Sequence, residues 1–204
     1  MKKILALILA LSMAFALAAC GGNTEETTTN APEVEATEAP TEGTTVEVES
    51  ALALLEAAWA NHNEEEKMYF MGGDMNNPVD GAPGKFDLSD AEAVEFTLGI
   101  PQAEIAKVDD AASIMHNMNA NNFTCGAYHV TDAANIQVLA DALKEALSNK
   151  QWMCGFPELL YIASIGDYLV CAYGSELNIT SLKADFTAAY GENVKVIYEE
   201  SLVF

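Results

Sequence analysis

The order of the periodic segments in residues 123–198 constrains the fold of this chain more than any other feature. Four segments there alternate apolar and polar side chains or form short apolar runs, which is typical of strands: 123–130, 159–165, 168–173 and 194–198. Two segments carry apolar residues at helical spacing: 132–148 and 175–190. The order is therefore strand, helix, strand, strand, helix, strand. Gly166 and Asp167 predict a two-residue hairpin turn between the two middle strands.

This is the split βαβ order of ferredoxin-like proteins, and we expect its two helices to pack on one face of an antiparallel sheet. Earlier segments predict further elements: a helix over 50–61 capped by Ser50, a helix over 90–98 behind a Ser89/Glu92 capping box, and a strand near 112–118. The predicted fold class is α+β, with residues 49–204 forming a single domain.

The first twenty residues have the pattern of an export signal. Lys2 and Lys3 precede an uncharged run over 4–17, and Ala18 and Ala19 stand before Cys20. The run is shorter than the roughly 20 apolar residues of a membrane-spanning helix. It is therefore expected to be removed, and an ordinary cut after Ala19 would leave Cys20 as a free thiol.

The same residues resemble the lipobox of bacterial lipoproteins. That resemblance implies a signal peptide over 1–19 and makes Cys20 the acylated first residue of the mature protein. Two acyl chains hold a protein stably on a membrane, since each buried methylene contributes about 0.8 kcal/mol. We therefore expect a location on the outer face of the cytoplasmic membrane, facing the cell wall, with the lipid on Cys20 as the membrane contact.

Residues 20–48 differ in composition from everything that follows. They are rich in Thr, Glu and Pro, and residues 21–48 contain no lysine and no aromatic side chain. Such a segment cannot bury enough apolar surface to offset its conformational entropy. The sequence predicts a disordered tether that holds the domain away from the lipid headgroups.

The charge of the chain excludes one class of partner. Nine lysines stand against 31 acidic residues, for a formal net charge of −22, and there is no arginine. A protein this acidic repels nucleic acid and lacks the guanidinium groups that bind phosphate in a bidentate manner. We therefore expect no nucleic-acid partner.

Three further segments resemble small uncharacterised lipoproteins of Gram-positive anaerobes that carry a domain of unknown function. The similarity rests on 118–120 before the strand over 123–130, on the helix over 132–147, and on the hairpin over 166–170. It supports the expected location and architecture and implies no activity.

Three cysteines follow Cys20 in the sequence, so at most one disulfide can form among them. Cys125 and Cys171 fall inside predicted strands, where a free cysteine behaves as a small apolar residue. Cys154 falls in a predicted loop and is the thiol expected to be accessible. A Cys154 nucleophile with His116 or His129 as its base is one alternative, a Cys-dependent enzyme.

Thioether, imidazole and thiolate groups together suit a soft metal ion such as Cu(I). Met115, His116, Met118, His129 and Cys154 are the candidate ligands, although methionines at such positions are commonly packing residues. A calcium loop from Asp74, Asn76 and Asp80 is a further alternative to a plain surface turn.

No cofactor or catalytic motif is evident in the sequence. Our expectation is a lipid-anchored extracellular protein, non-enzymatic, that binds or assists an unknown envelope protein or ligand. Soft-metal binding is the alternative function.

Overall fold

The computed structural model describes residues 47–118, 122–153 and 155–202, and all of them belong to one compact unit, Glu42–Phe204. The predicted signal peptide, Cys20, the tether up to residue 46 and Cys154 lie outside the described residues. The helices are α1 (Ala51–Trp59), α2 (Glu64–Lys67), α3 (Ala91–Ala93), the π-helix η1 (Val94–Leu98), the 3₁₀-helices η2 (Gln102–Lys107), η3 (Ala133–Asn135) and η4 (Gly191–Asn193), α4 (Ile136–Ser148) and α5 (Glu176–Tyr190). The strands are β1 (Phe70–Gly72), β2 (Val79–Asp80), β3 (Gly84–Lys85), β4 (Val108–His116), β5 (Thr124–Val130), β6 (Leu159–Ile165), β7 (Tyr168–Gly174) and β8 (Lys195–Ser201).

The strands form one antiparallel sheet in the order β2-β1-β4-β5-β7-β6-β8, with β3 also paired to β4. The predicted α+β class with an antiparallel sheet is confirmed. The hairpin at Gly166-Asp167 is confirmed as well: β6 and β7 pair from Ile165 and Tyr168 outward, and Gly166 has φ 57°.

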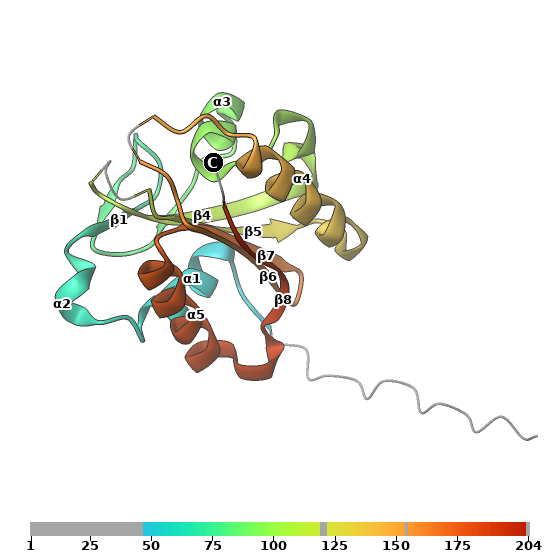
Figure 1. Ribbon diagram of the computed structural model, residues 1–204. Coiled ribbons are helices and arrows are strands. Elements are labelled where there is room, and N and C mark those ends of the chain that lie inside the picture. The colour runs from blue at the N-terminus through green and yellow to red at the C-terminus, as the bar shows by residue number, and fades with distance from the viewer. Residues whose placement is uncertain (1–46, 119–121, 154, 203–204) are drawn as a thin grey trace, which may run out of the picture. The chain divides into compact units, whose positions relative to one another are not determined.

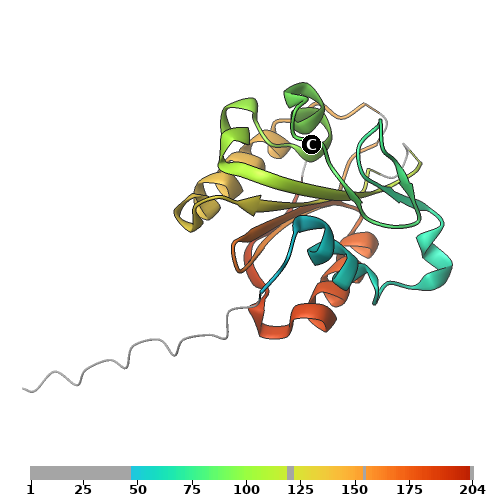
Figure 2. The ribbon, with the colours of Figure 1, turned by 180° about the vertical axis from the view of Figure 1, so that it is seen from behind.

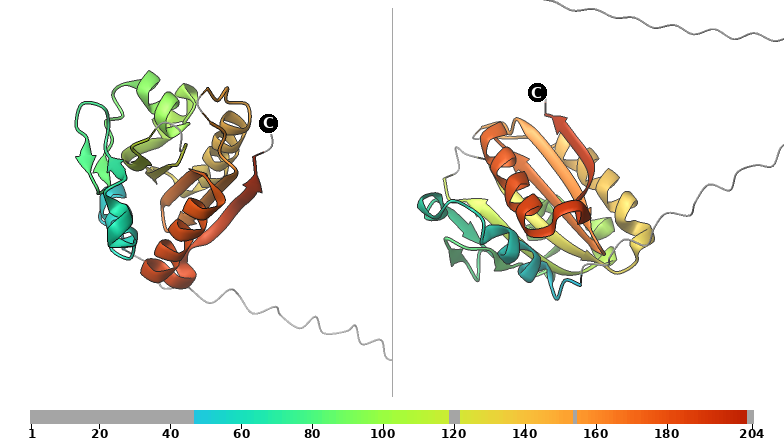
Figure 3. Two further views of the ribbon diagram at one scale, coloured as in Figure 1. Left: turned by 60° about the vertical axis from the view of Figure 1, so that its left-hand side comes forward. Right: turned by 90° about the horizontal axis from the view of Figure 1, so that it is seen from below.

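The helices cover both faces of the sheet, which corrects the expectation that they pack on one face. Alternate residues of β7 point to opposite sides: Val170 packs in the core under α1 and α5, and Leu169 in the core under α4 and η1. Figure 1 shows the sheet nearly edge-on, with α3 and α4 on one side and α1 and α5 on the other, and Figure 2 shows the same layers from behind. The view from below in Figure 3 shows α5 lying across its face of the sheet.

The strand order explains why two faces are covered. Both crossovers, β5-α4-β6 and β7-α5-β8, step toward the β8 edge, and each skips one strand. Crossovers between parallel strands are right-handed. Because β5 and β7 run in opposite directions, two right-handed crossovers in the same direction put their helices on opposite faces. The far edge of β5, where a final strand would restore the single-face arrangement, is occupied by β4.

Local sequence signals set most helix ends. Ser50 caps α1 by accepting a hydrogen bond from the Ala53 N–H at 3.0 Å, as its position predicts. The second predicted helix begins one residue later than its capping box, because Asp90 accepts from the Ala93 N–H at 3.1 Å. That helix then widens into η1 and ends at Gly99, whose φ is 77°.

Candidate functional site

A cleft of about 520 Å³ opens at the end of the sheet where β4 finishes and β5 begins. Its apolar lining consists of four methionines and four large aromatic residues: Met75, Met115, Met118, Met153, Phe96, Phe123, Trp152 and Tyr173. We call it the methionine cleft. Its volume lies within the range of roughly 300–1,000 Å³ that small-molecule sites occupy.

The strand register builds the floor of the methionine cleft. Met115 on β4 stands opposite Thr124 on β5, which stands opposite Tyr173 on β7. Directly opposed residues in antiparallel strands point to the same face, so these three side chains form a row across the sheet. Met71 on β1 extends the row on the other side of Met115.

The wall of the cleft is the C-terminal turn of η1, whose carbonyl groups have no partner further along the helix. Side chains from other elements satisfy them in succession: Lys150 Nζ donates to Phe96 O (2.7 Å), Tyr173 Oη to Thr97 O (3.1 Å) and Tyr128 Oη to Leu98 O (3.0 Å). Burial raises the pKa of Tyr173 to about 12. Its hydroxyl therefore stays a hydrogen-bond donor over the whole physiological range.

Lys150 is the cation in this wall. Its Nζ lies 4.9 Å from the ring centroid of Trp152, 5.2 Å from that of Phe96 and 5.6 Å from that of Tyr173. Burial lowers the pKa of Lys150, because water solvates the ammonium group less well in this environment. Lys150 follows the C-terminus of α4, and its side chain donates to η1.

The ion pairs of the described residues do not include Lys150. Apart from Lys150 and Lys195, each lysine of the domain forms an ion pair with a carboxylate: Lys67, Lys85, Lys107, Lys144 and Lys183. None of the described residues that line the cleft is Asp or Glu, although the chain carries 31 acidic residues. The methionine cleft is therefore a weakly cationic hollow in a strongly acidic protein.

The rim of the cleft exposes apolar side chains to solvent. Met153 is 89% exposed, Met75 85%, Phe96 72% and Met118 57%. Contiguous apolar exposure of this kind marks interaction sites on soluble domains, and flexible thioethers adapt to ligands of varied shape.

The structure brings together three of the five predicted metal ligands. Met115, His116 and Met118 all line the cleft. His129 does not join them: it lies five residues along β5 from Thr124, roughly 16 Å away at the rise of a strand, and its Nδ1 is 2.5 Å from Asp109 Oδ1. The fifth candidate, Cys154, lies outside the described residues.

His116 reaches the cleft as a neutral ring. Its Nδ1 accepts a hydrogen bond from the Met118 N–H at 3.1 Å, which puts the ring proton on Nε2. Burial lowers the pKa of His116. The ring also stacks on Tyr69, with centroids 6.3 Å apart, and meets Phe70 edge-on at 5.1 Å. Metal ligation through Nε2 requires that its proton leave.

Asp74 acts as a hydrogen-bond acceptor in a surface turn, which favours the plain turn over the alternative of a calcium loop. Its Oδ1 accepts from the Asn76 and Asn77 N–H groups at 2.7 and 2.9 Å, and its Oδ2 from the Asp87 N–H at 3.2 Å. Both oxygens are thus engaged with the backbone. Among the described residues no group of three or more His, Cys, Asp or Glu side chains is placed to hold a metal ion.

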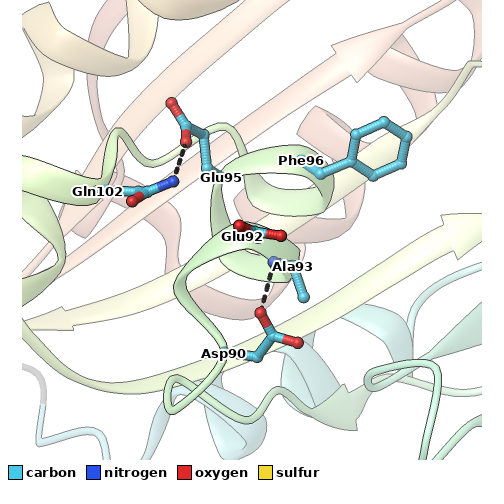
Figure 4. A pocket seen from close by; sticks show the side chains of 6 residues that line it. All are labelled: Asp90, Glu92, Ala93, Glu95, Phe96 and Gln102. Carbon is cyan, nitrogen blue, oxygen red and sulfur yellow. Dashed lines mark hydrogen bonds between the residues drawn. The ribbon is translucent and has the colours of Figure 1, made fainter.

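A second hollow, of about 630 Å³, is lined by residues of α3 and η1 with Asp90 and Gln102 (Figure 4), and Phe96 lines both hollows. Its carboxylates have local structural roles. Asp90 caps α3, and Glu95 accepts from Gln102 Nε2 at 2.8 Å. This hollow is open and acidic, and it contains no cation among the described residues that line it.

Cys125 and Cys171 are buried and free, as the sequence predicts. They belong to the cores on opposite faces of the sheet, so they cannot bond to each other. Burial raises the pKa of both thiols.

The sequence pattern does not identify Lys150, Trp152, Met75 or Phe96 as site residues. Met75 and Trp152 are large apolar residues in predicted loops, and Phe96 belongs to the helix predicted over 90–98, so periodicity groups none of them with Lys150. No protein-family model, curated protein or solved structure matches this chain. No helix among the described residues combines the length and apolar character that crossing a bilayer requires.

Proposed function

We propose that this protein is a lipid-anchored extracellular binding module of the cell envelope, and that the methionine cleft is its ligand site. The observation that carries the proposal is the exposed apolar rim, in which Met75, Phe96 and Met153 are each more than two-thirds exposed. Exposure of these side chains to water is unfavourable, and an apolar ligand that covers them gains about 25 cal/mol for each Å² it removes from water. The anchor is the acyl group on Cys20 that the lipobox resemblance implies.

A neutral apolar dye tests the site without assuming a ligand. Nile red fluorescence should rise when the dye is added to the full chain carrying Cys20→Ser, which removes the acylation site. The double variant Phe96→Ser, Met153→Ser should lose most of that rise. Leu177→Ser, Val196→Ser is the matched control, because both residues are exposed apolar side chains (78% and 52%) that do not line the cleft. Equal loss in both double variants would refute the assignment of the cleft.

The anchor has its own test. Mass spectrometry of the protein recovered from membranes should show diacylated Cys20 as the first residue. An unmodified Cys20 would contradict the lipid anchor and leave the cleft proposal standing.

Soft-metal binding is the second candidate, favoured by the arrangement of the methionines. Apart from Met1 and Met13, every methionine falls within residues 68–153. Four of these line the cleft, and Met71 pairs directly with Met115 on the neighbouring strand. Thioether sulfur is a preferred ligand of Cu(I).

Elemental analysis of protein purified without oxygen or chelator tests this candidate. A stoichiometric soft metal that Met115→Leu, Met118→Leu abolishes would support it, and a metal-free protein whose melting temperature Cu(I) does not raise would refute it. Zn²⁺ serves as the control ion, since it favours thiolate and imidazole ligands over thioethers.

A further inference from the structure

Lys150 is the feature of the methionine cleft that an apolar ligand alone does not explain. Its Nζ donates to one acceptor in the described residues, Phe96 O at 2.7 Å, whereas an ammonium group has three donors. Three aromatic rings surround it at 4.9–5.6 Å. Lys150 is partly buried, and partial removal of a cation from water without a counter-charge is unfavourable. In the free cleft, ring faces and one carbonyl group compensate for only part of the lost hydration.

The surroundings of Lys150 select the charge of a ligand. Carboxylates neutralise five of the other lysines of the domain, but none of the described residues that line the cleft is acidic. Any anion that enters therefore meets a cation without repulsion from the lining. The net charge of −22 repels anions from the molecule as a whole, so the local absence of carboxylates and the presence of Lys150 distinguish the cleft lining.

The remaining lining selects the body of the ligand. The floor and rim are thioethers and aromatic rings, and the neutral polar side chains are those of Thr97, His116, Asn122, Thr124 and Gln151. No arginine exists in the chain to grip a phosphate or sulfate in a bidentate manner. A single ammonium beside a large apolar surface matches a ligand with one small anionic group and a hydrocarbon body.

We infer that the methionine cleft binds apolar monocarboxylates. The carboxylate accepts a hydrogen bond from Lys150 Nζ, and the hydrocarbon packs against Met115, Trp152 and the exposed methionines of the rim. This inference rests on the proposed function of the cleft and names the chemical class of its ligand. Free aliphatic acids and the C-termini of apolar peptides share this chemistry.

Methyl NMR of the full chain carrying Cys20→Ser, labelled with ¹³C-methyl methionine, tests the inference. Octanoate and 1-octanol have the same hydrocarbon chain length and differ in charge. Octanoate should shift the methyl signals of Met75, Met115, Met118 and Met153 and bind about tenfold more tightly than octanol, as expected for a charge-assisted hydrogen bond in a partly desolvated site. N-acetyl-leucyl-phenylalanine and its C-terminal amide form a second pair, and the pair with the larger difference identifies the source of the carboxylate.

Lys150→Gln keeps a donor for Phe96 O and removes the charge. It should weaken octanoate binding about tenfold and leave octanol binding unchanged. Lys195→Gln is the control, because Lys195 also donates to a backbone carbonyl, Glu192 O at 2.7 Å, outside the cleft. It should change neither affinity.

The outcomes separate this inference from the proposed function. Cleft methyl shifts with equal affinity for both members of each pair would overturn the carboxylate assignment and leave the apolar site intact. Absence of cleft shifts with every probe would overturn both. The comparison of octanoate with octanol needs no substitution in the cleft, so it remains valid even if Lys150→Gln does not fold.

Discussion

His62 and Asp185 lie 123 residues apart in the chain, yet His62 Nδ1 and Asp185 Oδ2 are 2.6 Å apart. Both residues are buried, at 7% and 5% exposure. The His62 ring stacks on Trp59 with centroids 4.1 Å apart and meets Phe70 edge-on at 5.5 Å. This contact fixes the chain just after α1 to the middle of α5, on the face of the sheet away from α4.

Loss of the Asp185 carboxylate should destabilise the domain. Asp185→Ala leaves the His62 ring buried without its partner, and removal of one member of such a pair costs about 2–4 kcal/mol. Urea unfolding followed by circular dichroism measures the change. Glu66→Ala is the control: Glu66 Oε2 is 3.7 Å from His62 Nε2, but the Glu66 side chain is 53% exposed. Its loss should cost less than about 1 kcal/mol, and an equal cost for both variants would contradict the importance of the buried contact.

Asp74 should make the stability of the fold depend on pH in the acidic range. Burial alone would raise the pKa of Asp74, but hydrogen bonds from the N–H groups of Asn76, Asn77 and Asp87 outweigh it, and the net pKa is lowered. A carboxyl group whose pKa is lower in the folded state than in the unfolded state stabilises the fold at pH values above its unfolded pKa. That stabilisation is lost as the pH falls through the pKa of the folded state.

Asp74→Asn is the variant that tests this dependence. It should lower the free energy of unfolding at pH 7 by about 1–2 kcal/mol, because the NH₂ group of the asparagine is a donor and would face backbone N–H groups that are donors too. The difference between the two proteins should shrink as the pH falls below about 4. Urea unfolding at several pH values measures it, and a difference independent of pH would contradict the role of the ionised carboxylate.

The sequence predicts much of the fold because its signals are local. Periodicity predicts α1, α4, α5 and most of the strands, and Ser50 and the Gly166-Asp167 turn act at the predicted places. The side of the sheet on which each helix packs is not a local property. It depends on β8 joining the sheet beside β6 and on β4 occupying the far edge of β5.

The candidate site is less predictable because distant segments build it. Met115, His116 and Met118 are close in sequence and do meet at the cleft, whereas Met75, Phe96 and Lys150 come from three segments far apart in the chain: a turn, the helix η1 and the residues just after α4. His129 belongs to the same strand as Thr124 but lies near its other end, so a shared strand does not imply a shared site. Only the register of β4, β5 and β7 brings Met115, Thr124 and Tyr173 into one row.

The buried thiols should be unreactive in the folded protein. Burial raises the pKa of Cys125 and Cys171, and the thiolate is the reactive form. In the chain carrying Cys20→Ser and Cys154→Ser, an aromatic disulfide reagent at pH 8 should release no colour in native buffer and two equivalents in urea. Rapid reaction of either thiol without denaturant would show that its strand opens to solvent.

Gly126 makes room for the ring of Tyr128. A Cβ at residue 126 would stand 2.6 Å from Tyr128 Cζ and 2.7 Å from Cε1, closer than side chains can approach. Tyr128 is fully buried, and its hydroxyl donates to Leu98 O at 3.0 Å. The missing side chain of Gly126 thus lets β5 hold the end of η1, which forms one wall of the methionine cleft.

Gly126→Ala should therefore loosen this wall as well as the core. Overpacking costs about 1–3 kcal/mol, and displacement of the Tyr128 ring from Leu98 O should also shift the methyl signal of Met115 on the cleft floor. Urea unfolding and methionine-methyl NMR measure the two effects. The control is a double-mutant cycle with Tyr128→Leu, since Gly126→Ala should add little once the ring is gone. A full additional loss in the Tyr128→Leu background would mean that the added methyl group clashes with the strand itself, and that the ring of Tyr128 is not the reason for a glycine at this position.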